Sequence, residues 1–355
     1  MNGYDFWKNK KVFITGHTGF KGSWLSLWLQ HLGADVLGYA LDPPTSVNLF
    51  TGANIAKNMK DVRADIRDFQ TLSATMKQFN PDIIFHMAAQ PLVRYSYSYP
   101  IETYETNVMG TVHVLEASRQ CSNVRSIINV TTDKCYENRE WYWGYREEEP
   151  LGGNDPYSNS KACSELVTAA YRQSYFQKND KTGLASARAG NVIGGGDWAQ
   201  DRLLPDIIAA CVSGDPVKIR YPNAVRPWQH VLDPLNGYLH LAERLYNHPG
   251  AYAEAWNFGP SDQDAKSVAA ITDEILGLWG HPKKWESDEG THVHEATYLK
   301  LDCSKAHSKL KWHAHWNIHD ALKATVTWYQ EFYGGKNART ISLHQIENFM
   351  KGYAT

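Results

Sequence analysis

The chain has 355 residues, 43% of them hydrophobic and 21% charged, a balance typical of a globular protein with a sizeable core. With 36 Lys and Arg against 38 Asp and Glu, the formal net charge is -2, which argues against a nucleic-acid-binding protein. The five cysteines show no metal-binding or redox spacing, and no apolar run has the length of a signal segment or a membrane span. We therefore expect a cytoplasmic protein with reduced thiols, no bound metal and no membrane partner.

The predicted elements alternate between strand and helix over the first half of the chain. Lys11–Thr15 is a short apolar run that ends at a glycine, which is typical of a buried parallel strand. Apolar residues then recur at three- and four-residue spacing from Trp24 to Leu32, which predicts a helix that ends at Gly33. Further strands are predicted over residues 35–41, 61–66, 82–87, 124–130 and 184–189, and further helices over residues 69–79 and 101–119.

Strands that alternate with helices imply right-handed crossovers and a parallel sheet covered on both faces. We therefore predict an α/β fold, with a doubly wound parallel sheet (Rossmann) and a smaller mixed C-terminal lobe. After residue 190 the segments become rich in Gly, Pro and Trp, so we divide the chain into residues 1–188 and 189–355. The two parts are expected to interleave, with residues 228–256 returning to the first.

Three glycines between the first strand and the first helix have the spacing of a dinucleotide-binding loop. Gly16 permits a tight turn, Gly19 allows the backbone to approach a pyrophosphate, and Gly22 allows the helix to pack closely on the strand. An ordinary strand–turn–helix connection is the alternative. The strand before the glycines and the helix after them favour cofactor binding.

Acidic residues after the next two strands bear on which dinucleotide is bound. Asp42, just past the second strand, is placed to bind the adenosine ribose, although before two prolines it can equally be a turn residue. No Arg or Lys lies between Lys21 and Lys57, so a clamp for a 2′-phosphate is missing and NAD is favoured over NADP. Asp65 and Ile66, at the end of the third strand, are placed to meet the adenine edge, although Asp65 can alternatively cap the following helix.

Tyr157 and Lys161 lie four residues apart, on one face of a predicted helix. A neighbouring ammonium group lowers the pKa of a phenol, and a phenolate can remove the proton of an alcohol. Because a free Tyr has a pKa near 10, action as a base near neutral pH requires a shift of ~3 units, worth roughly 4 kcal/mol. The chain has 20 Tyr, so the pair gains weight only together with other motifs.

Four motifs together resemble those of the extended short-chain dehydrogenase/reductases: Thr15-Gly16-x-x-Gly19-x-x-Gly22, His86-Met-Ala-Ala-Gln90, Thr131-Thr132-Asp133 and Tyr157-x-x-x-Lys161. Similar stretches are Asn107-x-x-Gly110-Thr111, Arg188-x-Gly-Asn191-Val-x-Gly194 and Arg226-Pro-Trp-Gln-His230-Val. The resemblance covers about residues 10–315. Within the family it is greatest for the nucleotide-sugar 4,6-dehydratases that act on CDP-glucose, in the stretches HMAAQPLVR, DKCYEN, RAGNVIGGGDWA and RPWQHV.

The resemblance implies NAD as cofactor, a nucleotide-diphosphate sugar bound by the C-terminal lobe, and a role in deoxysugar biosynthesis such as that of lipopolysaccharide O-antigen. It also implies a homodimer, or a dimer of dimers, built on the helices that begin near Ile101 and Tyr157. The residues expected at the cofactor are Gly16, Thr18, Gly19, Phe20, Lys21, Gly22, Asp42, Asp65, Ile66, Ala88, Ala89, Gln90, Asn107, Tyr157 and Lys161.

The reaction implied by the resemblance is oxidation at C4, loss of water across C5 and C6, and hydride return to C6. Tyr157 would take the proton of the 4-hydroxyl with help from Lys161 and Thr132, although Thr132 can instead bond its own backbone. Asp133 is the candidate acid for the 6-hydroxyl, or else a turn residue. Lys134 stands where relatives that act on dTDP-glucose commonly carry Glu as the C5 base, so the identity of that base stays open.

Basic and polar residues are candidates for binding the sugar nucleotide, because Arg offers planar, bidentate donors to diphosphate oxygens. Each of them can instead be a surface or packing residue. The candidates are Arg94, Asn191, Arg202, Arg226, His230, Glu295 and Tyr298.

Three other functions stay open: a nucleotide-sugar 4-epimerase of the same fold, a dehydratase for another nucleotide, and a non-catalytic NAD-binding regulator. Such a regulator normally lacks the Tyr or the Lys of the motif, and both Tyr157 and Lys161 are present. An epimerase needs no acid for the 6-hydroxyl. A 4-keto-6-deoxy product, which absorbs near-ultraviolet light in base, therefore separates the two enzymes.

Overall fold

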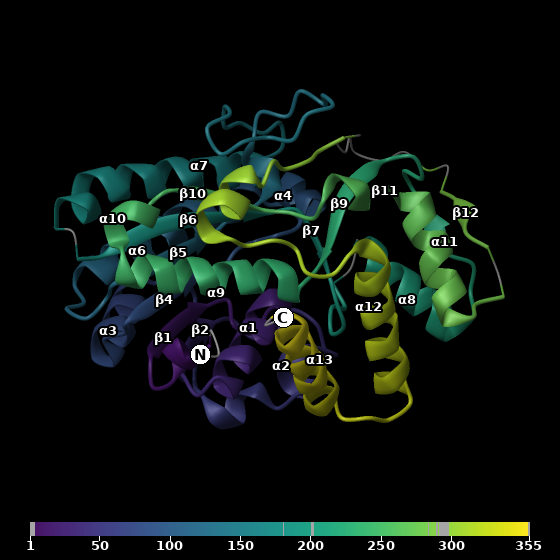
Figure 1. Ribbon diagram of the computed structural model, residues 1–355, viewed down its shortest axis with the longest axis horizontal. Helices are drawn as coiled ribbons and strands as arrows, with labels where there is room; N and C mark the ends of the chain where they lie inside the picture. Colours follow the sequence, from purple (N-terminus) through teal and green to yellow (C-terminus); the bar gives the residue numbers. More distant parts are fainter. Residues whose placement is uncertain are drawn as a thin grey trace.

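A seven-stranded sheet forms the centre of the fold (Figure 1). The computed structural model describes residues 4–179, 181–199, 202–282, 284–288, 290 and 298–353. Along the sheet all neighbouring strands run parallel, in the order β10 (Ala255–Phe258), β6 (Gly183–Ala189), β5 (Ser126–Val130), β4 (Ile83–His86), β1 (Lys11–Thr15), β2 (Asp35–Ala40) and β3 (Lys60–Arg63). The prediction of a doubly wound parallel sheet is confirmed.

Helices cover both faces of this sheet. The helices of the described residues, which include those of the smaller lobe, are α1 (Phe20–His31), α2 (Leu49–Gly52), α3 (Phe69–Phe79), α4 (Val93–Ser98), α5 (Pro100–Tyr104), α6 (Gly110–Arg119), α7 (Pro156–Tyr171), α8 (Leu203–Ser213), α9 (Leu232–Asn247), α10 (Pro249–Tyr252), α11 (Val268–Trp279), α12 (Ile318–Tyr333) and α13 (Ala338–Tyr353). Side chains of β1 alternate between the faces: Val12 and Ile14 pack with α1 and α9, whereas Phe13 packs with α3 and α6. Both faces of the strands are therefore buried, which explains their apolar runs.

Most predicted elements agree with the observed ones to within two residues at each end, but two differ in extent or continuity. The third strand ends at Arg63 rather than at residue 66. The helix predicted over residues 101–119 consists of α5, a wider π-helical turn (Glu105–Met109) and α6. Within that turn the Asn107 amide donates hydrogen bonds to the Gln90 carbonyl at 3.1 Å and to the Ser160 hydroxyl at 2.8 Å. The wider turn thus coincides with a polar contact to α7.

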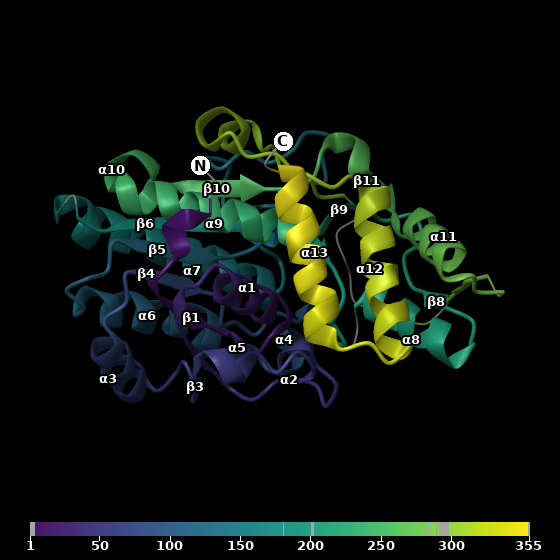
Figure 2. The ribbon, with the colours of Figure 1, turned by 60° about the horizontal axis from the view of Figure 1, so that its bottom comes forward.

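The second half of the chain returns to the first and also builds a smaller lobe. β10 pairs with β6, α9 packs on β5 and β6, and α13 packs on α1 and α2 (Figure 2). The lobe, which was predicted to be small and mixed, contains a mixed three-stranded sheet with α8, α11 and α12 nearby. Its strands are β7 (Asn191–Ile193), β9 (Val225–His230) and β11 (Ala265–Ser267), and a separate parallel pair is formed by β8 (Lys218–Ile219) and β12 (Glu286–Ser287). Among the described helices, none combines the length and apolarity needed to cross a membrane.

Candidate active site

A cavity of about 640 Å³ opens at the carboxyl ends of the central strands. The segments that follow β1, β4, β5 and β6 line it with Gly16, Ala88, Thr132 and Asn191, respectively. β1 and β4 are neighbours in the sheet, but the chain leaves β1 toward β2 on the other side. Open α/β sheets bind their ligands at such a reversal of strand order.

The glycine loop packs closely against its surroundings. Gly16 has a φ of 76°, and a Cβ atom there would lie 2.7 Å from the backbone nitrogen of Ala88. A Cβ atom at Gly22 would lie 2.1 Å from the Gly16 carbonyl oxygen, so this packing requires glycine. Helix α1 begins after Gly19 without a side-chain cap, an arrangement that fits a pyrophosphate. The loop residues that line the cavity are Gly16, Thr18, Gly19, Phe20, Lys21 and Gly22.

Asp42 also lines the cavity, with a side chain that is 88% exposed. The guanidinium of Arg63, on the adjacent strand β3, lies 3.3 Å from the Asp42 carboxylate and 2.8 Å from that of Asp61. A basic residue therefore stands beside the candidate ribose-binding acid, although none is close in the sequence. A cation that could bind a 2′-phosphate is therefore present in the fold, but it is paired with two carboxylates.

Asp65 and Ile66 line the cavity where the third strand ends. The Arg67 side chain hydrogen-bonds the Asp65 carboxylate at 2.6 Å and holds its pKa below the usual range, and the Arg67 backbone N–H donates to it at 2.9 Å. Helix α3 is capped by Asp68, which accepts a 3.1 Å hydrogen bond from the backbone of Thr71. The alternative in which Asp65 caps that helix is therefore wrong.

Tyr157 on α7 and Thr132 after β5 meet in the wall of the cavity. The N-cap of α7 is Asp155, whose carboxylate accepts a 2.9 Å hydrogen bond from the Ser158 backbone. Burial raises the pKa of Tyr157 to about 12, and a hydrogen bond with Thr132 opposes this shift. The Thr132 hydroxyl also accepts a 3.3 Å hydrogen bond from the Lys134 backbone. Thr132 thus bonds its own backbone and Tyr157 as well.

Lys161 lines the cavity one helical turn after Tyr157. Burial lowers the pKa of Lys161 to about 8, and the charges of Glu165 and Cys135 oppose the shift. Its Nζ donates a 3.3 Å hydrogen bond to the Val130 carbonyl at the end of β5. Within the chain alone, burial outweighs any effect of this ammonium on the Tyr157 pKa. A lowered Tyr157 pKa therefore requires a further positive charge in the cavity.

Asp133 is buried in the same wall, between Thr132 and Lys134. Burial raises the pKa of Asp133, and the Lys134 charge opposes the shift. Its Oδ1 accepts a 3.0 Å hydrogen bond from Thr132, whereas no described residue bonds its Oδ2. A carboxyl group that keeps its proton to a higher pH than usual can act as an acid.

Four of the candidate sugar-nucleotide residues line the cavity: Arg94, Asn191, Arg202 and Arg226. Arg202 also forms a 3.0 Å ion pair with Asp197. Three residues around β8 line the cavity and were missed from the sequence: Lys218, Arg220 and Tyr221. Their signal is the run Lys218-Ile-Arg-Tyr221, with two cations and an aromatic ring within four residues.

His230 does not line the cavity, so the structure does not support its prediction as a substrate-binding residue. Its ring is fully buried, with its centroid 4.7 Å from that of Trp316 and 6.2 Å from that of Trp24. Burial lowers the pKa of His230 to about 3, and its Nδ1 accepts a 3.3 Å hydrogen bond from the Leu232 backbone. The residue belongs to the aromatic core beneath the lobe.

Gln90 and Asn107 also do not line the cavity, so the structure does not support direct contact with a cofactor. The Asn107 side chain accepts a 2.9 Å hydrogen bond from the Gln90 backbone. The Gln90 amide in turn donates a 2.9 Å hydrogen bond to the Thr103 hydroxyl. The two residues position the loop after β4, whose Ala88 and Ala89 do line the cavity.

Tyr298 is likewise absent from the cavity lining, so the structure does not support direct contact with the substrate. Its backbone forms a bridge with Val225, and its carbonyl accepts a 3.2 Å hydrogen bond from the Asn138 amide. Glu295, the other candidate from this stretch, lies outside the described residues.

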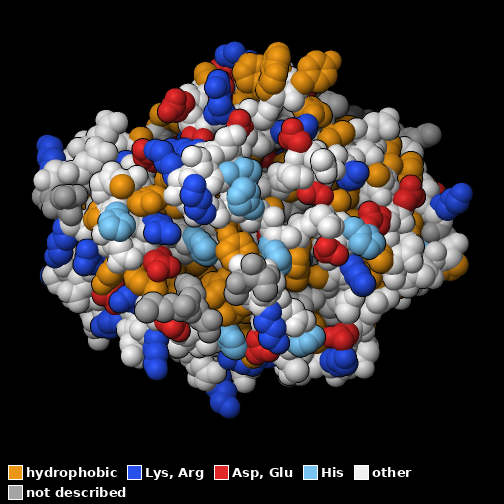
Figure 3. Space-filling model, viewed as in Figure 1, with side chains coloured by type: hydrophobic (Ala, Val, Ile, Leu, Met, Phe, Trp, Pro, Cys, Tyr) orange, Lys and Arg blue, Asp and Glu red, His pale blue; other side chains and the backbone are white. Residues whose placement is uncertain are grey.

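Hydrophobic side chains gather along the upper edge of the molecule in Figure 3, where Figure 1 places the loop before α7. The exposed aromatic residues of that loop are Tyr142 and Trp143. The neighbouring Trp141 stacks on Tyr145 with 5.3 Å between ring centroids. None of these four residues lines the cavity.

Known proteins resemble this chain over nearly its whole length. A CDP-glucose 4,6-dehydratase of Salmonella typhimurium is 54% identical over 350 residues, or 98% of both chains. A dTDP-glucose 4,6-dehydratase from Streptomyces venezuelae, solved with NAD and TYD bound, is 25% identical with a TM-score of 0.74 and matches 91% of this chain and 98% of that one. A UDP-glucose 4-epimerase from Thermotoga maritima has a TM-score of 0.80 at 21% identity over 91% of this chain and 99% of that one, which shows a shared fold.

A family model described as GDP-mannose 4,6 dehydratase matches residues 13–325. The matched range contains the glycine loop, the segment from Thr132 to Lys134, and the pair Tyr157 and Lys161. The resemblance to extended short-chain dehydrogenase/reductases, inferred from these motifs, is confirmed. The chain therefore belongs to the GDP-mannose 4,6 dehydratase family.

Proposed function

We propose that this chain is an NAD-dependent nucleotide-sugar 4,6-dehydratase, a lyase that converts CDP-glucose to CDP-4-keto-6-deoxyglucose. The observation that carries the proposal is Asp133, a buried carboxyl with a raised pKa in the same cavity as Tyr157. Epimerisation at C4 needs no acid for the 6-hydroxyl, whereas dehydration does. The 54% identity to a CDP-glucose 4,6-dehydratase supports CDP-glucose as the substrate.

We assign NAD to the glycine loop and the adjoining part of the cavity. A Cβ atom at Gly16 or Gly22 would clash with backbone, and the uncapped start of α1 meets the cavity, as pyrophosphate binding requires. Asp42 would bind the adenosine ribose, and Asp65 with Ile66 the adenine. Bound NAD⁺ would accept the C4 hydride and return it to C6, which leaves the overall reaction redox-neutral. The NAD in the 25% identical dehydratase supports this assignment.

The side chains of the cavity would carry the proton transfers at C4. Tyr157 removes the proton of the 4-hydroxyl while Thr132 hydrogen-bonds the same oxygen. Because the Tyr157 pKa is about 12 in the chain without cofactor, with burial as the largest cause, positive charge from Lys161 and from the cofactor must lower it in the complex. The resulting 4-ketone acidifies the proton on C5.

Loss of water across C5 and C6 follows when a base removes the C5 proton and Asp133 donates its proton to the 6-hydroxyl, which leaves as water. The raised Asp133 pKa keeps that proton available. Lys134 lines the cavity beside it, and its charge favours the ionised form of Asp133 that remains after proton donation. This charge effect supports a catalytic role for Lys134 that does not depend on its serving as the C5 base.

We assign the diphosphate of the sugar nucleotide to the arginines of the cavity, because guanidinium groups bind such oxygens in a bidentate manner. The ion pair with Asp197 already restricts the rotamers of Arg202. Less side-chain entropy would therefore be lost when Arg202 binds the diphosphate. The assigned residues are Arg94, Asn191, Arg202 and Arg226.

We also infer a cytoplasmic homodimer. Large hydrophobic side chains are exposed on α5, on the π-helical turn and on α7: Ile101 is 74% exposed and Leu166 is 58% exposed, and Tyr104 and Met109 are exposed nearby. A second copy related by twofold symmetry would bury them in a helical bundle. The five cysteines are free, in keeping with a reducing compartment.

The test uses the purified protein with NAD and, in turn, CDP-, dTDP-, UDP- and GDP-glucose. We expect CDP-glucose to give a 4-keto-6-deoxy product, detected by its near-ultraviolet absorbance in base and by mass loss of one water. A product of unchanged mass without the chromophore would identify an epimerase instead. Turnover of dTDP-glucose alone would overturn the choice of nucleotide, and no turnover of any sugar would favour a regulator.

A further inference from the structure

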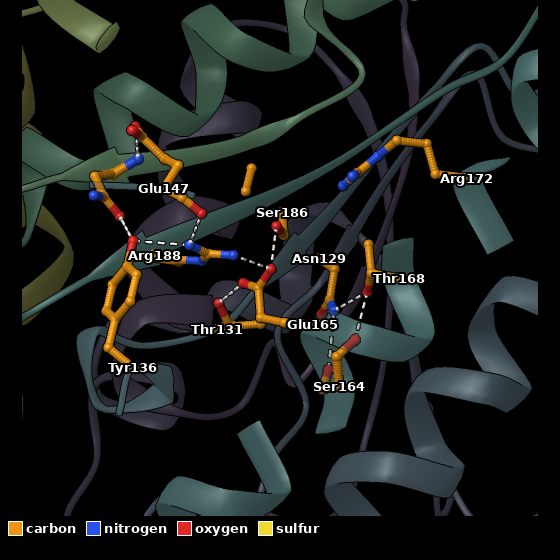
Figure 4. Close-up of polar contacts among 12 residues, drawn as sticks. Asn129, Thr131, Tyr136, Glu147, Ser164, Glu165, Thr168, Arg172, Ser186 and Arg188 are labelled. Atoms are coloured by element: carbon orange, nitrogen blue, oxygen red, sulfur yellow. Dashed lines mark hydrogen bonds and ion pairs between the residues drawn. The ribbon is translucent and has the colours of Figure 1, made fainter. Parts of the chain in front are cut away.

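A buried ion pair links the catalytic helix to the sheet beneath it. Glu165 follows Lys161 by one turn of α7, and Lys161 follows Tyr157 by one turn, so the three side chains share a face. The Glu165 carboxylate lies 2.9 Å from the guanidinium of Arg188 on β6, and their side chains are 2% and 4% exposed (Figure 4). Neither residue lines the cavity, and the proposed chemistry uses neither.

This pair forms hydrogen bonds with both ends of residues 131–136, the segment that carries Thr132, Asp133 and Lys134. At the start of the segment, the Thr131 hydroxyl donates a hydrogen bond to Glu165. At its end, Arg188 donates a 2.8 Å hydrogen bond to the hydroxyl of Tyr136 (Figure 4). The Cζ atom of Arg188 also lies 4.9 Å from the centroid of the Tyr136 ring. Residues 132–134 are therefore held from both sides by one ion pair.

Ion pairs buried this deeply add little net stability, because the desolvation of two charges offsets their attraction. Their geometric effect is larger, since both partners are confined by several hydrogen bonds. We propose that Glu165 and Arg188 form the positioning pair of the active site, which sets how Thr132 and Asp133 face Tyr157. The inference rests on the proposed function and deepens it.

Glu165 also contributes to the charge around Lys161. Burial lowers the pKa of Lys161 to about 8. The negative charge of Glu165 opposes that shift, and its effect is larger than that of Cys135. Burial would raise the Glu165 pKa, but Arg188 and the hydrogen bonds to its carboxylate keep it below its usual value, so Glu165 stays ionised. The other titratable and charged groups around these two residues are Tyr157 on α7, Arg172 at its end, Cys135 after β5, His86 on β4 and Lys21 on α1.

Three single variants separate the positioning of Thr132 and Asp133 from the effect of the Glu165 charge on Lys161. Thr131→Val removes the hydrogen bond to the segment but keeps both charges. Glu165→Gln removes the charge but keeps an oxygen acceptor. Ser186→Ala is the matched control, because Ser186 donates a 2.6 Å hydrogen bond to Glu165 yet touches neither the cavity nor the segment. For each variant, kcat and KM for CDP-glucose are measured across pH, together with the melting temperature.

Thr131→Val should lower kcat about 10- to 100-fold with little change in KM, because misplacement of reacting groups acts on the chemical step. Its pH profile should match that of the unaltered protein. Glu165→Gln should lower kcat similarly and move the alkaline limb of the kcat profile to lower pH, since the Lys161 pKa falls further. Ser186→Ala should change neither kcat nor the profile.

The inference is overturned if Thr131→Val keeps kcat within about twofold of the unaltered protein, a result that remains decisive if Glu165→Gln fails to fold. An unshifted alkaline limb in a folded Glu165→Gln protein would refute the charge effect on Lys161. A loss of activity in Ser186→Ala equal to that in Thr131→Val would indicate general destabilisation and count against positioning. Absence of dehydration by the unaltered protein, assayed alongside, refutes instead the proposed function.

Discussion

The Thr132 hydroxyl donates a 3.0 Å hydrogen bond to Oδ1 of Asp133, while Oδ2 of that carboxyl has no partner among the described residues. A single neutral donor stabilises an ionised carboxylate less than several donors do, and burial adds to this effect by raising the Asp133 pKa. The same Thr132 also bonds Tyr157. One hydroxyl thus joins the proposed base for C4 to the proposed acid for C6.

Replacement of Asp133 by Asn should abolish dehydration without abolishing substrate binding. The amide keeps an acceptor for Thr132 but cannot donate a proton to the 6-hydroxyl, so we expect kcat to fall by about 100-fold or more. Product formation is followed by the chromophore in base, and CDP-glucose binding by calorimetry. Asp133→Glu, which retains an acid, serves as the control. Dehydration by the Asn variant at an unchanged rate would contradict the role of Asp133.

Replacement of Tyr157 by Phe should lower kcat about 1,000-fold, because the ring still fills its site but the base for the 4-hydroxyl is lost. The dissociation constant for CDP-glucose should change little. Rapid-quench measurement of product in a single turnover, with enzyme in excess, reports the chemical step directly. Near-normal product formation by this variant would contradict the assignment of Tyr157 as the base.

Replacement of Asp42 by Asn should shift cofactor preference from NAD toward NADP. The change removes the carboxylate for the ribose and also one of the partners of Arg63, 3.3 Å away, which then becomes available to a 2′-phosphate. Because hydrogen bonds to charged groups contribute about 1.5–3 kcal/mol, the ratio of the two dissociation constants should change at least about 10-fold. Fluorescence titration with each cofactor measures it.

The matched control for this shift is the double variant Asp42→Asn with Arg63→Leu. It should lose affinity for NAD without any gain for NADP, because the guanidinium is gone. An equal gain in the single and the double variant would show that Arg63 plays no part in cofactor choice.

Replacement of Asp233 by Asn should make stability less dependent on pH. Burial raises the Asp233 pKa from 3.8 to about 7, so the folded chain binds a proton that the unfolded chain releases between those values. Stability from this site is therefore greatest at low pH and is lost as pH rises through this window, by on the order of 1.4 kcal/mol per pH unit. The free energy of unfolding, measured with denaturant at pH 5 and at pH 8, should differ less between the two pH values in Asp233→Asn than in the unaltered protein. Asp5→Asn, at an exposed position, is the control and should behave like the unaltered protein. An equal difference in both would refute the prediction.

Replacement of Leu166 by Glu should convert the proposed dimer to monomers, because the buried interface would then hold unpaired charges. Leu166 is 58% exposed on α7, whereas Val212 on α8 is 47% exposed and lies away from the proposed interface. Sedimentation velocity should show dimers for the unaltered protein and for Val212→Glu, but monomers for Leu166→Glu. A monomeric unaltered protein would contradict the dimer itself.

Several features of this molecule follow from the sequence because they depend on neighbours along the chain. The apolar run Lys11–Thr15 and the glycines after it specify β1, the turn and α1 locally, since strand burial, turn geometry and helix start are set within about 20 residues. The spacing of Tyr157 and Lys161 likewise places both on one face of α7, and both line the cavity. Strand–helix alternation was sufficient to predict the doubly wound sheet.

Other features were decided by the tertiary structure, because they join residues that the sequence separates. Arg63 stands beside Asp42 since β3 pairs with β2, and Lys218 reaches the cavity because the lobe folds back over the sheet. His230 resembled a binding residue in its motif, yet the packing of Trp24 and Trp316 buries it. Local periodicity encodes the type of each element, whereas the order of strands and the packing of side chains determine which distant residues share a site.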